Sequence, residues 1–148
     1  MKTVTKCIVL LAMSVLMLTG CKTSFNERWA TETKFPSNDV PMIGAWDGTW
    51  TSSETGETGK IRAIVRRVDR NSYHALFCAT YKETLDFEYP FYLYTSYESK
   101  QIVKFRGHAN LGDDAGGMHY YEGDSTGSTF TINYKSTNDH GVFELARP

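Results

Sequence analysis

The chain has 148 residues, of which 41% are hydrophobic and 22% are charged, and its formal net charge is −1. This length suits one ordinary domain with enough apolar side chains to bury a core. The 16 Lys and Arg residues are balanced by 17 Asp and Glu residues and form no basic run, so composition argues against nucleic acid as a partner.

The first residues have the order of an export signal. Lys2 and Lys6 precede an uncharged apolar run over 7–18, which is shorter than the roughly 20 residues that a spanning helix needs. Leu18-Thr19-Gly20-Cys21 follows and resembles the lipobox of bacterial lipoproteins. The resemblance implies a signal peptide over 1–20, with acyl chains such as palmitate on Cys21 as the membrane anchor.

Cleavage before Cys21 would leave 128 of the 148 residues, with 14 bases, 17 acids and a net charge of −3. Cys78 would then be the one cysteine without an acyl chain, so no disulfide is expected within the mature chain. Position 22 is Lys rather than Asp. By resemblance to the enterobacterial sorting pattern, this implies a cell-envelope location in the outer membrane.

Residues 21–43 are expected to be a lipidated, flexible linker. From Lys22 onward they show no sustained period of 2 or 3.6, and two prolines interrupt them. A flexible chain of about 20 residues reaches roughly 25 Å. Trp29 and Phe35 would either contact the domain or stay loosely exposed, and the sequence leaves both alternatives open.

A single domain is expected over 44–148, made of short runs rich in Thr, Tyr, Phe, Val and Ile between turn residues. Their spacing leaves no room for crossover helices, so neighbouring strands should pair antiparallel. We predict eight strands, over 46–52, 60–68, 73–81, 87–95, 101–109, 117–124, 129–135 and 141–147.

Apolar and polar residues alternate along these runs, so each strand has one face for the interior. For example, Ile61, Ala63 and Val65 alternate with Arg62 and Arg66. Without a helix to cover the apolar face, closure hides that face and the sheet edges. The predicted fold class is therefore all-β, an eight-stranded antiparallel up-and-down barrel, with a two-sheet sandwich as the alternative.

Gly44-Ala45-Trp46-Asp47-Gly48-Thr49-Trp50 resembles the first strand of the calycin group, which comprises lipocalins, fatty-acid-binding proteins and avidins. That resemblance implies that Arg147 in the last strand lies across Trp46. The chain also resembles a set of small, uncharacterised bacterial lipoproteins. The shared motifs are Gly-Thr-Trp at 48–50, Phe-Arg-Gly-x-Ala-x-Leu-Gly at 105–112, Ala-Gly-Gly at 115–117, Tyr-x-Gly at 121–123 and Asp-His-Gly-x-Phe at 139–143.

Motifs of catalysis are not found, and the protein is not expected to be an enzyme. Cys78 and His74 would lie about 13 Å apart along one strand, so an inert thiol is the better interpretation. His108, His119 and His140, with nearby aspartates, match no standard metal spacing. No metal or cofactor is expected.

The predicted interior face is unusually aromatic, with glycine and alanine between the rings. Its candidate ligand-binding residues are Trp50, Tyr73, Phe77, Tyr81, Tyr89, Phe91, Phe105, His119, Tyr121 and Tyr134. Such a wall with phenolic hydroxyls suits a pocket for a small apolar or aromatic molecule. The alternative is that the rings meet and fill an eight-stranded barrel.

These two interiors lead to two functions. A hollow barrel predicts a membrane-anchored binder of a small hydrophobic ligand. A filled barrel predicts a structural or interaction lipoprotein whose outer face contacts another envelope protein, and outward-facing Tyr92, Tyr94 and Tyr120 would favour it.

Overall fold

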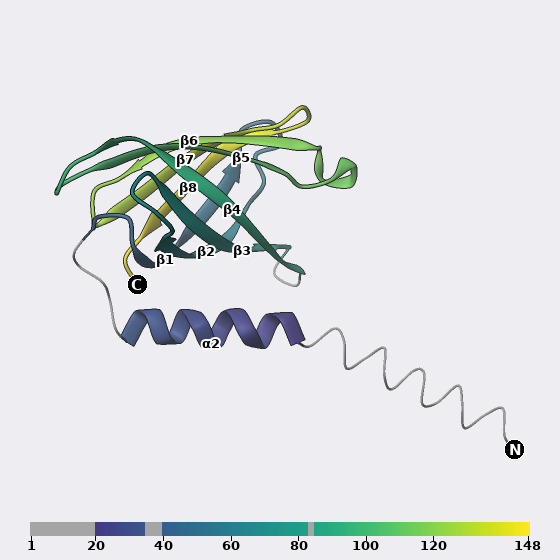
Figure 1. The fold of residues 1–148 in the computed structure, drawn as a ribbon. Coiled ribbons are helices and arrows are strands. Elements are labelled where there is room, and N and C mark those ends of the chain that lie inside the picture. Colours follow the sequence, from purple (N-terminus) through teal and green to yellow (C-terminus); the bar gives the residue numbers. More distant parts are fainter. Residues whose placement is uncertain (1–19, 35–39, 83–84) are drawn as a thin grey trace, which may run out of the picture.

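The computed structural model describes residues 20–34, 40–82 and 85–148. Eight strands curve into one closed antiparallel barrel in which each strand pairs with its neighbours along the chain and β8 pairs with β1 (Figure 1). The elements are α2 (Gly20–Lys34), β1 (Gly44–Ser52), β2 (Thr58–Arg67), β3 (Ser72–Tyr81), β4 (Leu85–Glu98), β5 (Val103–Asn110), the 3-10 turn η1 (Asp113–Ala115), β6 (Met118–Ser125), β7 (Thr129–Lys135) and β8 (His140–Ala146). The predicted all-β, up-and-down barrel is confirmed, and the sandwich is excluded. The signal segment over 1–19 lies outside the described residues.

Alternation along the strands sets the interior as expected. On β5, Val103, Phe105 and Gly107 are buried while Lys104 and Arg106 are exposed. The same period of two holds on β7 and β8. Closure gives every strand two hydrogen-bonded neighbours, so the barrel presents no free sheet edge.

One end of the barrel is sealed by residues 40–43, which the sequence assigned to the linker. Met42 is fully buried in the core, and Val40 and Ile43 pack against it. Ser125 Oγ donates to the Pro41 carbonyl at 2.8 Å. The prediction of a flexible linker up to residue 43 is therefore wrong for this stretch, which closes the end opposite the β1–β2 turn. We call it the sealed end.

At the sealed end, Arg147 lies over Trp46, with its guanidinium carbon 3.7 Å from the ring centroid. The guanidinium also donates to three carbonyls, those of Gly127, Ala45 and Pro41, at 3.0–3.2 Å. Burial lowers the pKa of Arg147, but an arginine stays charged in any case. The contact expected between Trp46 and Arg147 is confirmed, and the arginine also ties the 40–43 segment to the barrel.

We expect Arg147→Ala to destabilise the domain by about 2–4 kcal/mol, because charge-assisted hydrogen bonds contribute about 1.5–3 kcal/mol each and are not additive. Trp46→Ala removes a fully buried ring and should cost about 3–5 kcal/mol. Urea denaturation measures both. The control is Arg106→Ala, which breaks a solvent-exposed pair with Glu122 and should cost less than about 1 kcal/mol. Equal losses for Arg147→Ala and Arg106→Ala would contradict the role of Arg147.

Residues 21–34, also expected to be flexible, belong to helix α2, which lies along the outside of the barrel (Figure 1). Phe25 is 1% exposed and packs on Ile64, Leu76 and Cys78, which point outward from β2 and β3. Trp29 packs against the same cluster, and its Nε1 donates to the Trp46 carbonyl at 3.4 Å. Trp29 thus contacts the barrel, whereas Phe35 lies outside the described residues.

Polar contacts fix the direction of α2. Arg62 donates to Asn26 Oδ1 at 2.8 Å, and Arg66 pairs with Glu32 farther along both elements. The Arg62 guanidinium also lies 5.1 Å from the Phe25 ring centroid. Helix α2 therefore runs in the same direction as β2, with its last turn toward the sealed end. An isolated helix of this length is marginal in water, so docking on the barrel stabilises it.

We expect Phe25→Ala to loosen α2 and to uncover Cys78. In the parent the thiol is buried under the helix, and burial raises its pKa, so labelling by a thiol reagent should be slow. In the chain from Lys22 onward, where Cys78 is the one cysteine, the variant should label at least tenfold faster, since losing a buried phenyl costs about 3–5 kcal/mol. Thr31→Ala, on the exposed side of α2, is the control. Unchanged labelling in Phe25→Ala would show that the helix does not protect the thiol.

Candidate functional site

A stack of aromatic rings crosses the barrel interior. The rings of Phe77 and Phe91 lie 4.8 Å apart and nearly parallel, and Phe91 stacks on Tyr121 at 4.1 Å. Tyr89 lies 5.9 Å from Phe77 and 6.1 Å from Phe91. We call Phe77, Tyr89, Phe91 and Tyr121 the ring stack. Offset parallel rings at these distances attract one another beyond their buried area.

Between the ring stack and the sealed end the interior is filled. Phe130 contacts Trp46 at 5.2 Å and Phe105 at 5.4 Å between ring centroids, and all three are fully buried. Small side chains such as Ala63 and Ala75 complete the packing. This half of the barrel is therefore a core.

On the other side of the ring stack the barrel opens into a cavity of about 530 Å³. We call it the mouth cavity, since it lies at the end formed by the turns that follow β1, β3, β5 and β7. Its lining residues are Trp50, Ala79, Tyr81, Phe87, Glu88, Tyr89, Leu111, Asp114, Ala115, His119, Tyr121, Tyr134, Asp139 and Phe143. The volume lies within the range of small-molecule sites, about 300–1,000 Å³, and the lining is largely aromatic as in such sites.

One wall of the mouth cavity holds a fixed carboxylate. Asp139 lies in the turn between β7 and β8, and its two oxygens accept hydrogen bonds from Ser52 Oγ at 2.6 Å and Tyr134 Oη at 2.9 Å. Burial and the bond to Asp139 raise the pKa of Tyr134, so the phenol stays protonated and donating. On the same side, Trp50 Nε1 donates to the Thr80 carbonyl at 3.1 Å, which holds the indole against Tyr81.

The hydroxyls of Tyr89 and Tyr121 reach the mouth cavity without a hydrogen-bond partner among the described residues. Tyr121 is 3% exposed, and Tyr89 is half-buried with its free side toward the cavity. Burial raises the pKa of both phenols. Both hydroxyl oxygens are accessible, because Thr95 Oγ1 is the one buried side-chain polar atom without a partner among the described residues, so water or a ligand can reach them. These two groups therefore mark where a bound molecule would make polar contacts.

The ten candidate wall residues divide at the ring stack. Trp50, Tyr81, Tyr89, His119, Tyr121 and Tyr134 line the mouth cavity. Phe77 and Phe91 are buried in the ring stack itself, and Phe105 is buried in the core half. Tyr73 lies near the sealed end, where its hydroxyl donates to Glu98 at 3.0 Å.

The sequence did not identify the remaining liners as ligand-binding residues. Phe87 shares the inward parity of Tyr89 and Phe91 and could have been added on that signal. Asp139 was assigned to a turn, and nothing local to it indicated a cavity wall.

Gly123 is one of the glycines between the interior rings, and it faces no open space. A Cβ there would lie 2.0 Å from the Thr131 carbonyl oxygen and 2.9 Å from Phe105. The glycine lets β7 approach β6 closely in the core half. Ala79 is the small strand residue in the described lining of the mouth cavity.

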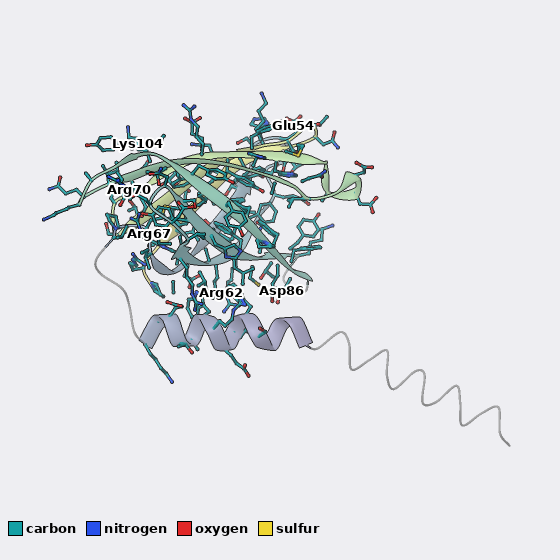
Figure 2. The ribbon with its side chains drawn as sticks, viewed as in Figure 1. Glu54, Arg62, Arg67, Arg70, Asp86 and Lys104 are labelled. Carbon is teal, nitrogen blue, oxygen red and sulfur yellow. The ribbon has the colours of Figure 1, made fainter. Side chains whose placement is uncertain are left out.

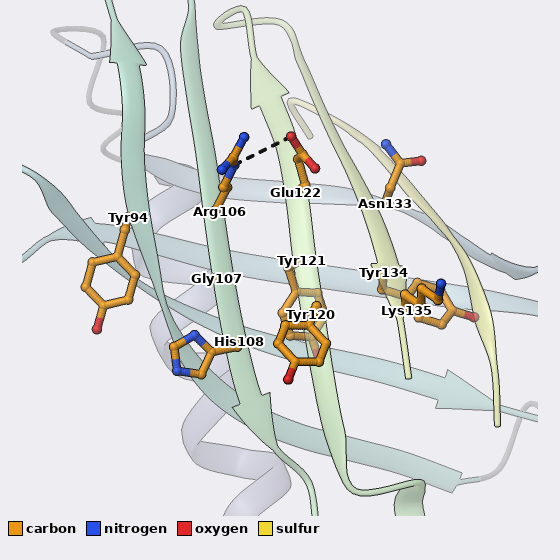
Figure 3. Close-up of a pocket in the computed structure, with 10 residues that line it drawn as sticks. All are labelled: Tyr94, Arg106, Gly107, His108, Tyr120, Tyr121, Glu122, Asn133, Tyr134 and Lys135. Carbon is orange, nitrogen blue, oxygen red and sulfur yellow. Dashed lines mark ion pairs between the residues drawn. The ribbon is translucent and has the colours of Figure 1, made fainter. Parts of the chain in front are cut away.

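A second, shallow depression of about 600 Å³ lies on the outer face of β4–β7 (Figure 3). Tyr94, His108 and Tyr120 point outward around it, and Arg106 pairs with Glu122 at 3.6 Å. Tyr92, Tyr94, Tyr97 and Tyr120 are 49–59% exposed. Because outward side chains surround it, this depression is an open surface rather than an enclosed site.

Other candidates do not assemble into sites. Cys78 is buried under α2, while the ring of His74 lies against Tyr92 on the outer face. His108 is exposed, whereas His119 points inward. In the part of the chain that the structure describes, no three His, Cys, Asp or Glu side chains converge to hold a metal. The described part also contains no helix of the length and apolarity needed to cross a membrane.

Comparisons with known proteins support the fold alone. No family model matches the chain, and no curated protein sequence is similar to it. A solved structure described as a redesigned beta barrel matches with a TM-score of 0.53 and 12% identity, over 72% of this chain and 91% of that one. At that identity the likeness shows a shared barrel architecture and carries nothing about activity or ligand.

Proposed function

We propose that the protein is a non-enzymatic, lipid-anchored lipoprotein of the cell envelope that binds a small apolar or aromatic molecule in the mouth cavity. The observation that supports ligand binding is the cavity of about 530 Å³ next to a packed ring stack, with the hydroxyls of Tyr89 and Tyr121, which have no partner among the described residues, facing it. A barrel that served only as a scaffold would gain stability by filling this volume. The anchor rests on the lipobox resemblance at 18–21.

The exposed tyrosines of the outer face favour a second candidate, a protein partner on β4–β6. Tyr is enriched at protein interfaces because it offers a large rigid contact area with a polar tip. Tyr92, Tyr94 and Tyr120 provide such a surface. This interaction function does not need an occupied mouth cavity, so the same binding experiment separates the two candidates.

We expect Cys21→Ser to abolish lipid attachment, because the acyl chains require the cysteine thiol. Each buried methylene contributes about 0.8 kcal/mol to membrane binding, so a processed protein without the chains should leave the detergent phase. Detergent partitioning and intact mass of protein from bacterial cells measure the change. Lys22→Ala, next to the anchor, is the matched control and should partition like the parent. A processed Cys21→Ser protein that stays in the detergent phase would contradict the anchor.

We expect Ala79→Leu to block ligand binding and to leave stability within about 1 kcal/mol of the parent, because the added side chain enters open volume. The probe is N-phenyl-1-naphthylamine, a neutral dye whose fluorescence rises in apolar sites. It is used with the full chain carrying Cys21→Ser, so that no acyl chain is present to bind the dye. A steric overlap that costs about 1–3 kcal/mol should lower the affinity for the dye roughly tenfold or more.

Ala75→Leu is the matched control on the same strand and face. Ala75 is fully buried in the core half, so this change should cost about 1–3 kcal/mol of stability while the folded fraction still binds dye. A parent that binds no dye would reject the mouth cavity as a ligand site and leave the outer face as the stronger candidate.

A further inference from the structure

The two ends of the barrel carry opposite charge. The turns at the mouth include Glu54, Glu57, Asp113, Asp114 and Asp139, and the one base among their described residues is Lys82. The turns and terminus at the sealed end include Arg70, Lys100 and Arg147 against Asp69. In Figure 2, Arg67, Arg70 and Lys104 lie toward one end of the barrel, and Glu54 and Asp86 lie toward the other.

This asymmetry matters because a cleft lined by one sign of charge concentrates counter-ions at its entrance. Glu88, Asp114 and Asp139 are the acidic residues of the mouth cavity's described lining, and neither Lys nor Arg belongs to it. An anionic ligand would meet those carboxylates, and Lys82 is the one base in the described turns around them. A cation would be attracted to the entrance.

The walls are of a kind that binds cations. Trp50 and Tyr81 stack with ring centroids 6.2 Å apart, and Tyr89, Tyr121 and Phe143 add further aromatic side chains to the lining. Aromatic faces attract ammonium groups through the ring quadrupole, and such cages are a known means of binding methylated amines. The rim already holds one such contact, since Lys82 Nζ lies 5.0 Å from the Tyr81 ring centroid.

Asp139 is placed to meet the charge of such a ligand. Ser52 and Tyr134 hold it at the wall through one hydrogen bond to each oxygen, and each carboxylate oxygen has a second lone pair available. Deeper in the cavity, the 3%-exposed Tyr121 presents a hydroxyl that lacks a partner among the described residues. A phenol oxygen can accept a hydrogen bond from an ammonium group.

We propose that the mouth cavity selects a cationic ligand, a protonated or quaternary amine joined to a small flat or apolar body. This inference rests on the proposed function and names its ligand class. The apolar body lies on the ring stack, and the ammonium group lies between the aromatic wall and Asp139.

The test compares three ligands of one shape: 3-phenylpropylamine, 3-phenylpropan-1-ol and 3-phenylpropanoate. Each is titrated into the full chain carrying Cys21→Ser by calorimetry and by displacement of N-phenyl-1-naphthylamine. At low salt the amine should bind about tenfold more tightly than the alcohol, and the carboxylate more weakly than either. Because the cavity is partly open, about 0.5 M salt should reduce the preference for the amine.

Asp139→Asn should lower the preference for the amine over the alcohol to about threefold, since an amide keeps the shape but loses the charge. Asp69→Asn is the matched control, an aspartate in a turn at the sealed end, and should retain the tenfold preference. If Asp139→Asn does not fold, Asp114→Asn on the exposed turn η1 replaces it and should lower the preference in the same direction.

The outcomes separate this inference from the proposed function. If the parent binds the dye but prefers the alcohol, or binds none of the three ligands, the proposed preference for a cation is wrong. The apolar ligand site of the proposed function is then retained. A parent that binds neither dye nor ligand overturns both. Full amine preference in a folded Asp139→Asn protein and in Asp114→Asn also overturns the inference, because neither aspartate of the lining would be its source.

Discussion

The ring stack is the contact on which the rest of the interior depends. Phe77, Phe91 and Tyr121 lie nearly parallel across the barrel, so they occupy its cross-section with few atoms along its axis. Eight strands enclose an interior just wide enough to be filled by side chains or to hold one small ligand. The ring stack allows a filled half and an open half in one barrel. It is the last layer of the core on the mouth side and also the floor of the mouth cavity.

The sealed end makes the barrel asymmetric. Met42 and its neighbours fill the opening there, and Arg147 holds them through the Pro41 carbonyl. Among the described residues, the sealed end is filled, so a molecule entering the barrel would use the mouth. Sealing, filling and positive charge coincide at one end, whereas opening, aromatic lining and negative charge coincide at the other. The same strands thus supply stability at one height and a candidate site at another.

The strands and their faces could be predicted because both depend on a local period of two. The set of inward rings followed from the same pattern, but the height of each ring along the axis did not. Ala75 and Ala79 have the same parity and chemistry, yet the first lies in the core and the second lines the cavity. Height depends on strand tilt and on register with distant strands, which alternation within one strand does not encode.

Helix α2 was missed for a similar reason. Phe25 and Trp29 are spaced for one helix face, but two apolar residues in a polar segment predict little alone. The missing information lay in β2 and β3, where Ile64, Leu76 and Cys78 put an apolar patch on the outer face. Three such residues on paired strands indicate a covering element.

The direction of α2 bears on how an anchored barrel would be oriented. Because the helix runs alongside β2 from the mouth end toward the sealed end, position 21 in its first turn lies on the mouth side. With acyl chains there, the docked helix would hold the anchor close to the barrel, whereas a disordered linker would let the domain move away from it. It would pivot about a short joint instead of sampling a hemisphere, so the bilayer would stay nearer to the acidic opening than to the basic end.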